Sequence, residues 1–244
     1  MKKIVIYTQN CSWWPITNRK KYFKLINDFI EQAKPDIVFL QEIFDKKWVK
    51  HFEIEGYTCV FEAKKIFLHG GLVIMVKNSI EVESCYIGRF QSQFGFKPKQ
   101  FLSSLLVRRG FLHVYLPHFN LHLVNSHLTA GFSRNHKYNP TRFMQVNQLK
   151  NYVSNLGMCI FGGDLNFHEH TPEHELLKVF CKDLTAGVGN TFASEKGRYD
   201  YIFSSNIKKI SAVPLLVPWY EHPRFFGGRP IDHHGIITQV QWED

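Results

Sequence analysis

Residues 158–167, MCIFGGDLNF, end a short apolar run with a carboxylate and a carboxamide two positions apart. The apolar part predicts a buried strand, and its polar end is expected to stay near solvent. Side chains two positions apart in an extended segment point the same way, so we expect Asp164 and Asn166 to share one pocket. Gly162 and Gly163 permit a close approach of neighbouring backbone or of a substrate.

Polar clusters also lie at or near the ends of other apolar runs. They are Tyr7-Thr8-Gln9-Asn10, Leu40-Gln41-Glu42, Asn125-Ser126-His127-Leu128, Tyr199-Asp200-Tyr201 and Asp232-His233. A strand's apolar body becomes buried, whereas the polar groups at its end remain accessible. If these clusters and the segment 162–167 converge at one sheet edge, they form a metal and phosphate site.

The chain opens with the pattern of strand, helix and strand. We expect a strand over 4–8, a helix from the N-cap Asn18 to about residue 33, and a buried strand over 36–40 after Pro35. Buried strands joined by a helix imply a sheet that helices cover.

The middle of the chain is richer in strands than the opening. Short turns separate most of them, so we expect mainly antiparallel pairing. The expected strands are 57–61, 72–76, 80–87, 101–107, 111–116 and 121–126. A helix over about 140–155 follows, and antiparallel strands over 207–217 and 234–240 finish the chain. No linker, repeat or low-complexity segment divides the sequence, which predicts one domain over 1–244.

The composition is that of a globular, basic protein. Of the 244 residues, 44% are hydrophobic, and the net charge is +9, which suits a polyanionic partner or an anionic membrane surface. Five cysteines without a CxxC spacing indicate a reducing compartment. The apolar run 4–7 is too short for a signal peptide, and no stretch is long enough to span a membrane. We therefore expect a cytoplasmic or otherwise intracellular protein.

Six motifs occur in an order and spacing that are together specific. They are Asn10, Gln41-Glu42, Asn125-x-His127, Gly163-Asp164-x-Asn166, Tyr199-Asp200-Tyr201 and Asp232-His233-His234-Gly235. In this order the motifs resemble those of the endonuclease/exonuclease/phosphatase superfamily, whose members are magnesium-dependent phosphoesterases. The resemblance extends from Ile4 to Ile237. The resemblance implies an α+β fold: a two-layer β-sandwich of mixed, largely antiparallel sheets flanked by helices. It also implies a single catalytic domain, which we expect to be a monomer.

The resemblance assigns a metal site to Glu42, Asn10 and Asp232. Mg²⁺ prefers oxygen ligands and keeps several waters, so one or two carboxylates suffice to hold it. Mn²⁺ is expected to be able to substitute. Ile231 stands where the superfamily has a small hydroxyl residue, which affects only the fine positioning of Asp232.

The resemblance also assigns the reaction, an in-line attack of an activated water on a phosphodiester or phosphomonoester. His127 and His233 are expected to face the phosphate, His127 in the charged form that an anion favours. Asp200 is expected to hydrogen-bond His233 and so fix its tautomer for proton transfer. Asp164 is expected to orient or deprotonate the water, and Asn166 to donate to a phosphate oxygen.

Four further residues are candidates for substrate binding. Arg142, on the helix after the His127 loop, could reach back to a phosphate, although a solvated helix face explains it nearly as well. Trp13, Phe225 and Phe226 could stack on bases or enter a membrane interface, and loop packing is the alternative.

Several phosphoesters remain open as substrates. Basic charge and aromatic residues favour a nuclease, whereas residues 108–114, RRGFLHV, and the following His127 segment resemble the sphingomyelinase branch. The expected partner is therefore a nucleic acid or a phospholipid. A phosphoinositide phosphatase and a non-catalytic binding module on the same fold are the alternatives.

Overall fold

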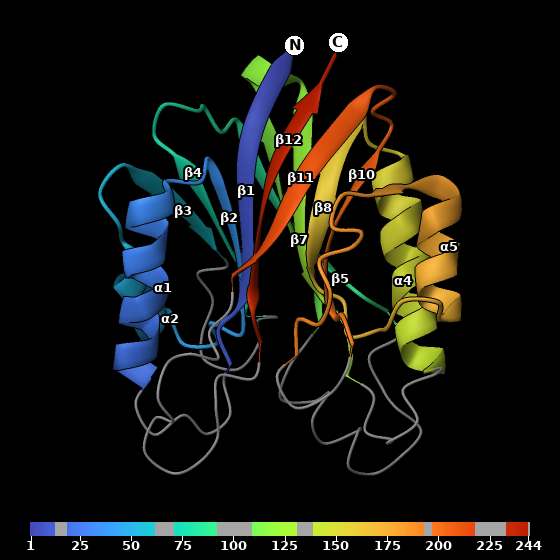
Figure 1. The fold of residues 1–244 in the computed structure, drawn as a ribbon, viewed down its shortest axis with the longest axis horizontal. Helices are drawn as coiled ribbons and strands as arrows, with labels where there is room; N and C mark the ends of the chain where they lie inside the picture. The colour runs from blue at the N-terminus through green and yellow to red at the C-terminus, as the bar shows by residue number, and fades with distance from the viewer. Residues whose placement is uncertain are drawn as a thin grey trace.

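The structure is a computed structural model, and it describes residues 1–12, 19–61, 71–91, 109–130, 139–192, 197–217 and 233–243. Two sheets of six strands each pack face to face, and helices cover their outer faces (Figure 1). The expected α+β sandwich is confirmed.

The two sheets are mixed but largely antiparallel. In spatial order the first consists of β11 (Ile210–Val217), β12 (Gly235–Trp242), β1 (Lys2–Asn10), β2 (Ile37–Gln41), β4 (Val73–Lys77) and β3 (Tyr57–Phe61). The second consists of β5 (Ser84–Arg89), β6 (Gly110–Leu116), β7 (Leu121–His127), β8 (Met158–Asp164), β10 (Asp200–Ser205) and β9 (Lys182–Asp183). Among the strands that the described residues form, only β1 with β2 and β7 with β8 pair in parallel. Each parallel pair is joined through a helix, as parallel strands require.

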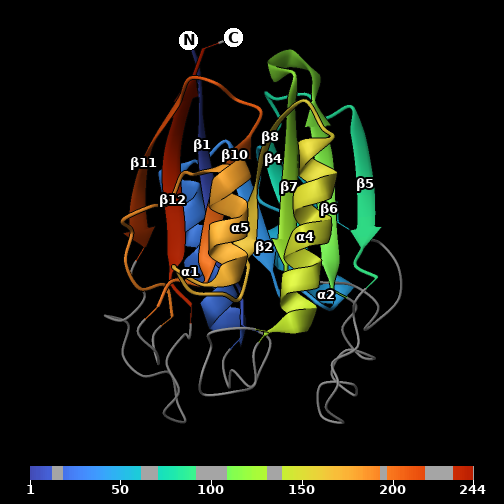
Figure 2. The same cartoon turned by 90° about the vertical axis from the view of Figure 1, so that its right-hand side faces the viewer.

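Helices lie against both outer faces. The described residues form α1 (Arg19–Ala33), α2 (Lys46–Val49), α4 (Pro140–Ser154), α5 (Pro172–Phe180) and the 3₁₀ turns η1 (Lys50–Phe52) and η2 (Pro117–Phe119). Figure 1 shows α1 and α2 beside the first sheet, and Figure 2 shows α4 and α5 together in front of the second. Asn139 and Thr171 cap α4 and α5, each followed by proline at the first helical position. Within the described part of the chain, no helix has the length and apolar character needed to cross a bilayer.

The main core lies between the two sheets. Because alternate residues of a strand point to opposite faces, one set from each strand fills this space. Its members include Ile6, Phe39, Ile74, Leu112, Leu123, Ile160 and Ile202. Strand β2 is buried along its whole length, since α1 and its neighbours cover its second face.

For most of these elements, the bounds predicted from the sequence differ from the observed bounds by only a few residues. The strand expected over 80–87 starts later, at Ser84, and the helix from 140 ends at Ser154. The strand expected over 101–107 and the N-cap Asn18 lie outside the described residues. Both termini lie at one end of the sandwich, and β1, β2, β7 and β8 all finish at the other (Figure 1).

Candidate active site

The polar strand ends gather at one end of the sandwich, and both sheets contribute to them. Asn10 and Glu42 come from the ends of β1 and β2 in the first sheet, and His127 and Asp164 end β7 and β8 in the second. The clusters therefore meet at one end of the sandwich, across two sheets, and not along the edge of a single sheet. The chain places one parallel strand pair in each sheet, and both pairs point their carboxyl ends the same way.

Asp164 is at the centre of the site and is 1% exposed. Its Oδ2 accepts from Asn10 Nδ2 at 2.8 Å and lies 3.2 Å from His127 Nε2, and its Oδ1 accepts from the Asn166 backbone N–H at 3.0 Å. Burial alone would raise the pKa of this carboxyl, but His233, His127 and Asn10 outweigh it and hold the pKa well below its usual range. Asp164 is therefore a carboxylate at neutral pH.

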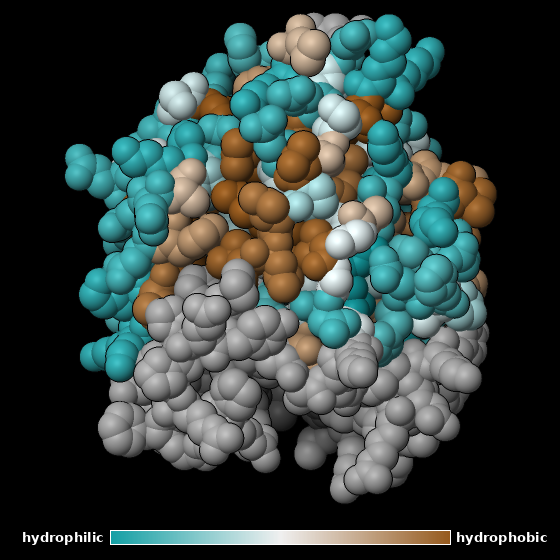
Figure 3. All heavy atoms as spheres, viewed as in Figure 1, coloured by the Kyte–Doolittle hydropathy of each residue, from teal (hydrophilic) through white to brown (hydrophobic). Residues whose placement is uncertain are grey.

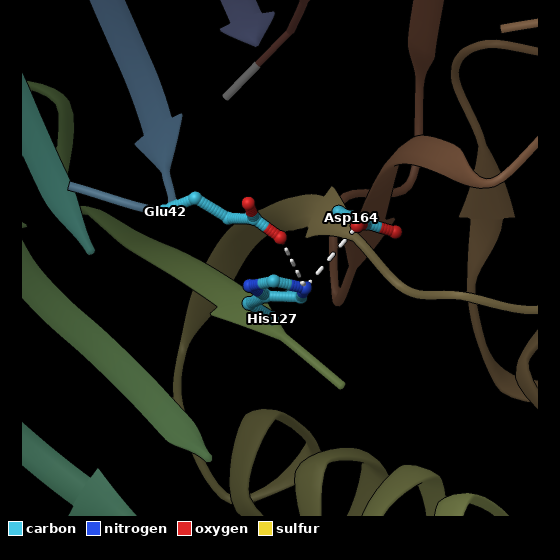
Figure 4. A group of neighbouring side chains, drawn as sticks. All are labelled: Glu42, His127 and Asp164. Carbon is cyan, nitrogen blue, oxygen red and sulfur yellow. Dashed lines mark ion pairs between the residues drawn. The ribbon is translucent and has the colours of Figure 1, made fainter. Parts of the chain in front are cut away.

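Figure 4 shows Glu42, His127 and Asp164 converging, with the imidazole between the two carboxylates. His127 Nε2 lies 3.8 Å from Glu42 Oε1 and 3.2 Å from Asp164 Oδ2. Glu42 follows β2 with a left-handed backbone, φ 66°. This conformation is rare for non-glycine residues, and where it occurs it is often at a functional site.

Arg109 contacts the other nitrogen of the His127 ring, through its Nη1 and the ring Nδ1. A guanidinium only donates, so Nδ1 accepts and the neutral ring carries its hydrogen on Nε2, facing Asp164. Burial and Arg109 lower the pKa of His127, although Asp164 and Glu42 oppose them. The sequence predicted a charged His127 from the effect of a bound phosphate alone. In the structure, burial and Arg109 disfavour the charged form of the ring.

His233 and Asp200 form the pair that the sequence led us to expect. His233 Nδ1 lies 2.9 Å from Asp200 Oδ2, and its Nε2 lies 3.8 Å from Asp164 Oδ2. Phe192 packs edge-on against the imidazole with ring centroids 4.9 Å apart. Burial raises the pKa of Asp200 despite the opposing effect of His233, and Asp164 raises it further.

The strand ends include donor sets that fit a hard divalent cation. Among the described residues, two groups bring possible ligand atoms within 4.8 Å of one another: Glu42, His127 and Asp164, and Asp164, Asp200 and His233. Glu42 and Asp164 supply the carboxylate oxygens that Mg²⁺ prefers. Asn10 Oδ1 accepts from the Ser12 N–H at 2.9 Å, and an amide oxygen has a second lone pair for a cation.

Asn166 does not share an extended face with Asp164, so this expectation is wrong. Strand β8 ends at Asp164, and Asn166 has a left-handed backbone, φ 55°. The Asp164 side chain accepts the N–H two residues on, which closes a turn of the kind that aspartate favours. Asn166 Nδ2 then donates to Leu128 O at 3.1 Å and ties the ends of β7 and β8 together.

Gln41 and Asn125 join the two sheets behind the site. Gln41 Nε2 donates to Asn125 Oδ1 at 2.9 Å, and Asn125 Nδ2 donates to Leu40 O and Val73 O, both at 2.9 Å. A Cβ on Gly163 would collide with the backbone oxygen of Ser126 and with Asn125 Oδ1, and it would crowd Gln41 Nε2. The glycine therefore gives room to neighbouring protein groups, one of the alternatives that the sequence left open.

Arg142 lies in a different place from the one we expected. It is wholly buried, and its Nε donates to Glu173 Oε1 at 3.0 Å, so it links α4 to α5. One turn further along α4, Gln145 exchanges two hydrogen bonds of 2.9 Å with Thr129, which fixes the chain just after His127. The Arg142–Glu173 pair joins residues far apart in sequence, and no local pattern indicates it.

A second buried ionic network borders the site on the side of Asp200. Arg198 is 2% exposed and contacts Asp183 Oδ2 at 2.5 Å and Glu169 Oε1 at 2.6 Å. Burial of Asp183 opposes ionisation, but His174 and Arg198 outweigh it and lower its pKa to about 2. This network anchors the segment that leads into β10.

Some predicted residues cannot be placed. Trp13, Phe225, Phe226 and Asp232 lie outside the described residues. Arg109 was not among the residues predicted for the site. Counting the register of the β6–β7 hairpin, which sets Gly110 opposite His127, would have found it.

No family model and no curated protein matches the chain. Solved structures match over its full length. TDP2 of D. rerio, complexed with a single-strand DNA product, superposes with a TM-score of 0.72 at 16% identity, covering 99% of this chain and 100% of that one. Beta toxin from Staphylococcus aureus gives 0.76 at 18% identity, covering 98% and 100%. The endonuclease/exonuclease/phosphatase from Bacteroides vulgatus gives 0.72 at 14% identity, covering 100% of both chains.

The chain has the endonuclease/exonuclease/phosphatase fold. The sequence resemblance is thereby confirmed at the level of the fold, over the whole chain. The polar strand ends that carried the resemblance meet at one end of that fold.

Proposed function

We propose that this protein is a divalent-metal-dependent phosphodiesterase. The observation that carries the proposal is the set of groups around Asp164: two histidines, Asn10 and, across His127, Glu42. A phosphodiester resists attack because its charge repels the nucleophile, so hydrolysis needs a cation, a base and donors for the phosphate oxygens. The carboxylate and amide oxygens can hold the cation, and the histidines can act as the base and as donors to the phosphate oxygens.

The protein groups then take separate roles. Glu42 and Asn10 would hold Mg²⁺, or Mn²⁺ in its place, which supplies positive charge to the phosphoryl oxygens. The Asp164 carboxylate, which stays ionised, orients the attacking water. His127 donates its Nε2–H to a phosphate oxygen. His233, held by Asp200 at Nδ1, takes up the proton of the attacking water at Nε2 and delivers it to the leaving oxygen.

A nucleic acid is the substrate class we favour. The net charge of +9 suits a polyanion, and the TDP2 structure of the same fold contains single-strand DNA. A phospholipid is the second candidate. Figure 3 shows apolar side chains gathered on the face of β11 and its neighbours, where Val213 and Leu215 are 61% and 62% exposed.

Both levels of the proposal can be tested with purified protein. Hydrolysis of bis(p-nitrophenyl) phosphate should require Mg²⁺ or Mn²⁺ and stop on addition of EDTA. Single-strand DNA, RNA, sphingomyelin vesicles and phosphoinositides should then be compared as substrates under the same conditions. Binding of a nucleic acid without turnover of any phosphoester would leave only a binding module on this fold, and the proposal would be wrong.

A further inference from the structure

A glutamine side chain lies wholly buried in the apolar layer between the first sheet and α1. Gln9 is 0% exposed on β1, and the neighbouring Tyr22, Phe23 and Ile26 of α1 are 1%, 2% and 0% exposed. Burying an amide among such side chains is costly unless hydrogen bonds satisfy it. Its partners therefore indicate what the residue does.

The contacts of Gln9 reach its own strand, helix α1 and His233, which lies just before β12. Tyr7 Oη donates to Gln9 Oε1 at 2.9 Å, which fixes the orientation of the amide. Gln9 Nε2 lies 2.6 Å from Asn10 O, 3.0 Å from Tyr22 Oη and 3.3 Å from His233 O, so its two N–H groups share three acceptors. Tyr22 Oη donates in turn to Asn10 O at 3.1 Å. One amide therefore holds the main-chain carbonyls of two predicted site residues.

The opposing strand leaves room for this arrangement. Gly235 begins β12, just beyond the pair Thr8–Ile236 that sets its register with β1. A Cβ at Gly235 would collide with the Tyr7 ring and with Gln9 Oε1. The glycine that ends the Asp-His-His-Gly motif is thus required by the side chains behind the site.

We propose that Gln9 is a positioning residue, which sets the spacing between the metal-binding end and the imidazole end of the site. This inference rests on the proposed function. The side chain of Asn10 donates to Asp164, and the ring of His233 pairs with Asp200. A shift of either carbonyl moves the attached side chain away from its carboxylate.

The sharpest perturbation is Gln9→Glu, because the new side chain has the same shape. It still accepts from Tyr7, but it loses both N–H donors, including the one that faces Tyr22 Oη, and points an oxygen at two carbonyls. Val240→Ala is the matched control. Val240 is 0% exposed on β12, so its truncation lowers stability through core packing alone, without a polar contact.

Two measurements separate positioning from general stability. In Gln9→Glu, kcat on the small diester should fall about 10- to 100-fold while KM changes less than about threefold. The ¹⁵N resonances of the His233 ring, recorded without metal, should shift or broaden. Val240→Ala should leave both readouts at the wild-type level while lowering the Tm.

The outcomes decide the inference in every case. Unchanged His233 resonances in Gln9→Glu overturn it, whatever the activity. Absence of metal-dependent hydrolysis in the wild-type protein refutes the proposed function, and the resonances alone then test Gln9. If Gln9→Glu does not fold, Tyr22→Phe removes one hydroxyl from the same cluster and should show the same changes at smaller size, whereas wild-type behaviour there overturns the inference.

Discussion

Replacing Asp200 by asparagine tests the coupling between this buried carboxylate and the imidazole of His233. The two side chains meet at 2.9 Å, with Asp200 0% exposed. A hydrogen bond to a charged group is worth about 1.5–3 kcal/mol, which corresponds to about 10- to 150-fold in rate. We therefore expect Asp200→Asn to lower kcat/KM on a small phosphodiester by about that factor.

Stability should respond differently from activity. Burial raises the pKa of Asp200, which means that the charged form is costly in this site. Asparagine removes that cost, so the Tm should stay constant or rise. In a double-mutant cycle with His233→Ala, the double variant should be little slower than the slower single variant. Losses that multiply would show that the two residues act independently, and our reasoning about the pair would be refuted.

Three further predictions concern the metal, the helix pair and pH. Glu42→Ala should lower kcat at least about 100-fold with an unchanged Tm, because this half-buried residue adds little to the core; wild-type turnover would exclude it as a ligand. Arg142→Met should destabilise by about 3–5 kcal/mol, since it leaves Glu173 buried without its cation, and adding Glu173→Met should restore part of the loss in urea unfolding. The pKa of Asp183 is lowered to about 2, so its contribution of about 2 kcal/mol should be complete above pH 4 and disappear as the pH falls towards 2. The unfolding free energy of Asp183→Asn should lack that pH dependence, and an identical pH profile would contradict the assignment.

The fold could be predicted because its signals are local. Apolar runs of strand length located β1, β2, β3 and β8, and the order of the polar strand ends indicated the fold that the solved structures share. The Asp200–His233 contact followed from that resemblance alone. Nothing in the periodicity relates two residues 33 positions apart.

What the sequence did not predict depends on side chains that compete with the backbone or meet across the fold. Asn166 was expected to be extended, but the Asp164 carboxylate captures its N–H and turns the chain. Arg142 was considered for substrate binding because its carboxylate partner, Glu173, lies on another helix and cannot be recognised from the local sequence. Gln9 stood within a recognised polar cluster, yet only the packing of α1 reveals that its amide points away from the site, towards main-chain carbonyls.

The position of β1 between β2 and β12 has a consequence for how the protein is made. A ribosome releases β1 before β12, so one hydrogen-bonding edge of β1 lacks its partner strand while the chain between them is made. Such an edge invites pairing with other chains. The nascent chain should therefore be prone to such pairing until β12 emerges, and the pairing of β12 also brings the His233 carbonyl to Gln9. The proposed phosphodiesterase activity should appear only once β12 has paired with β1, which makes activity a late reporter of folding.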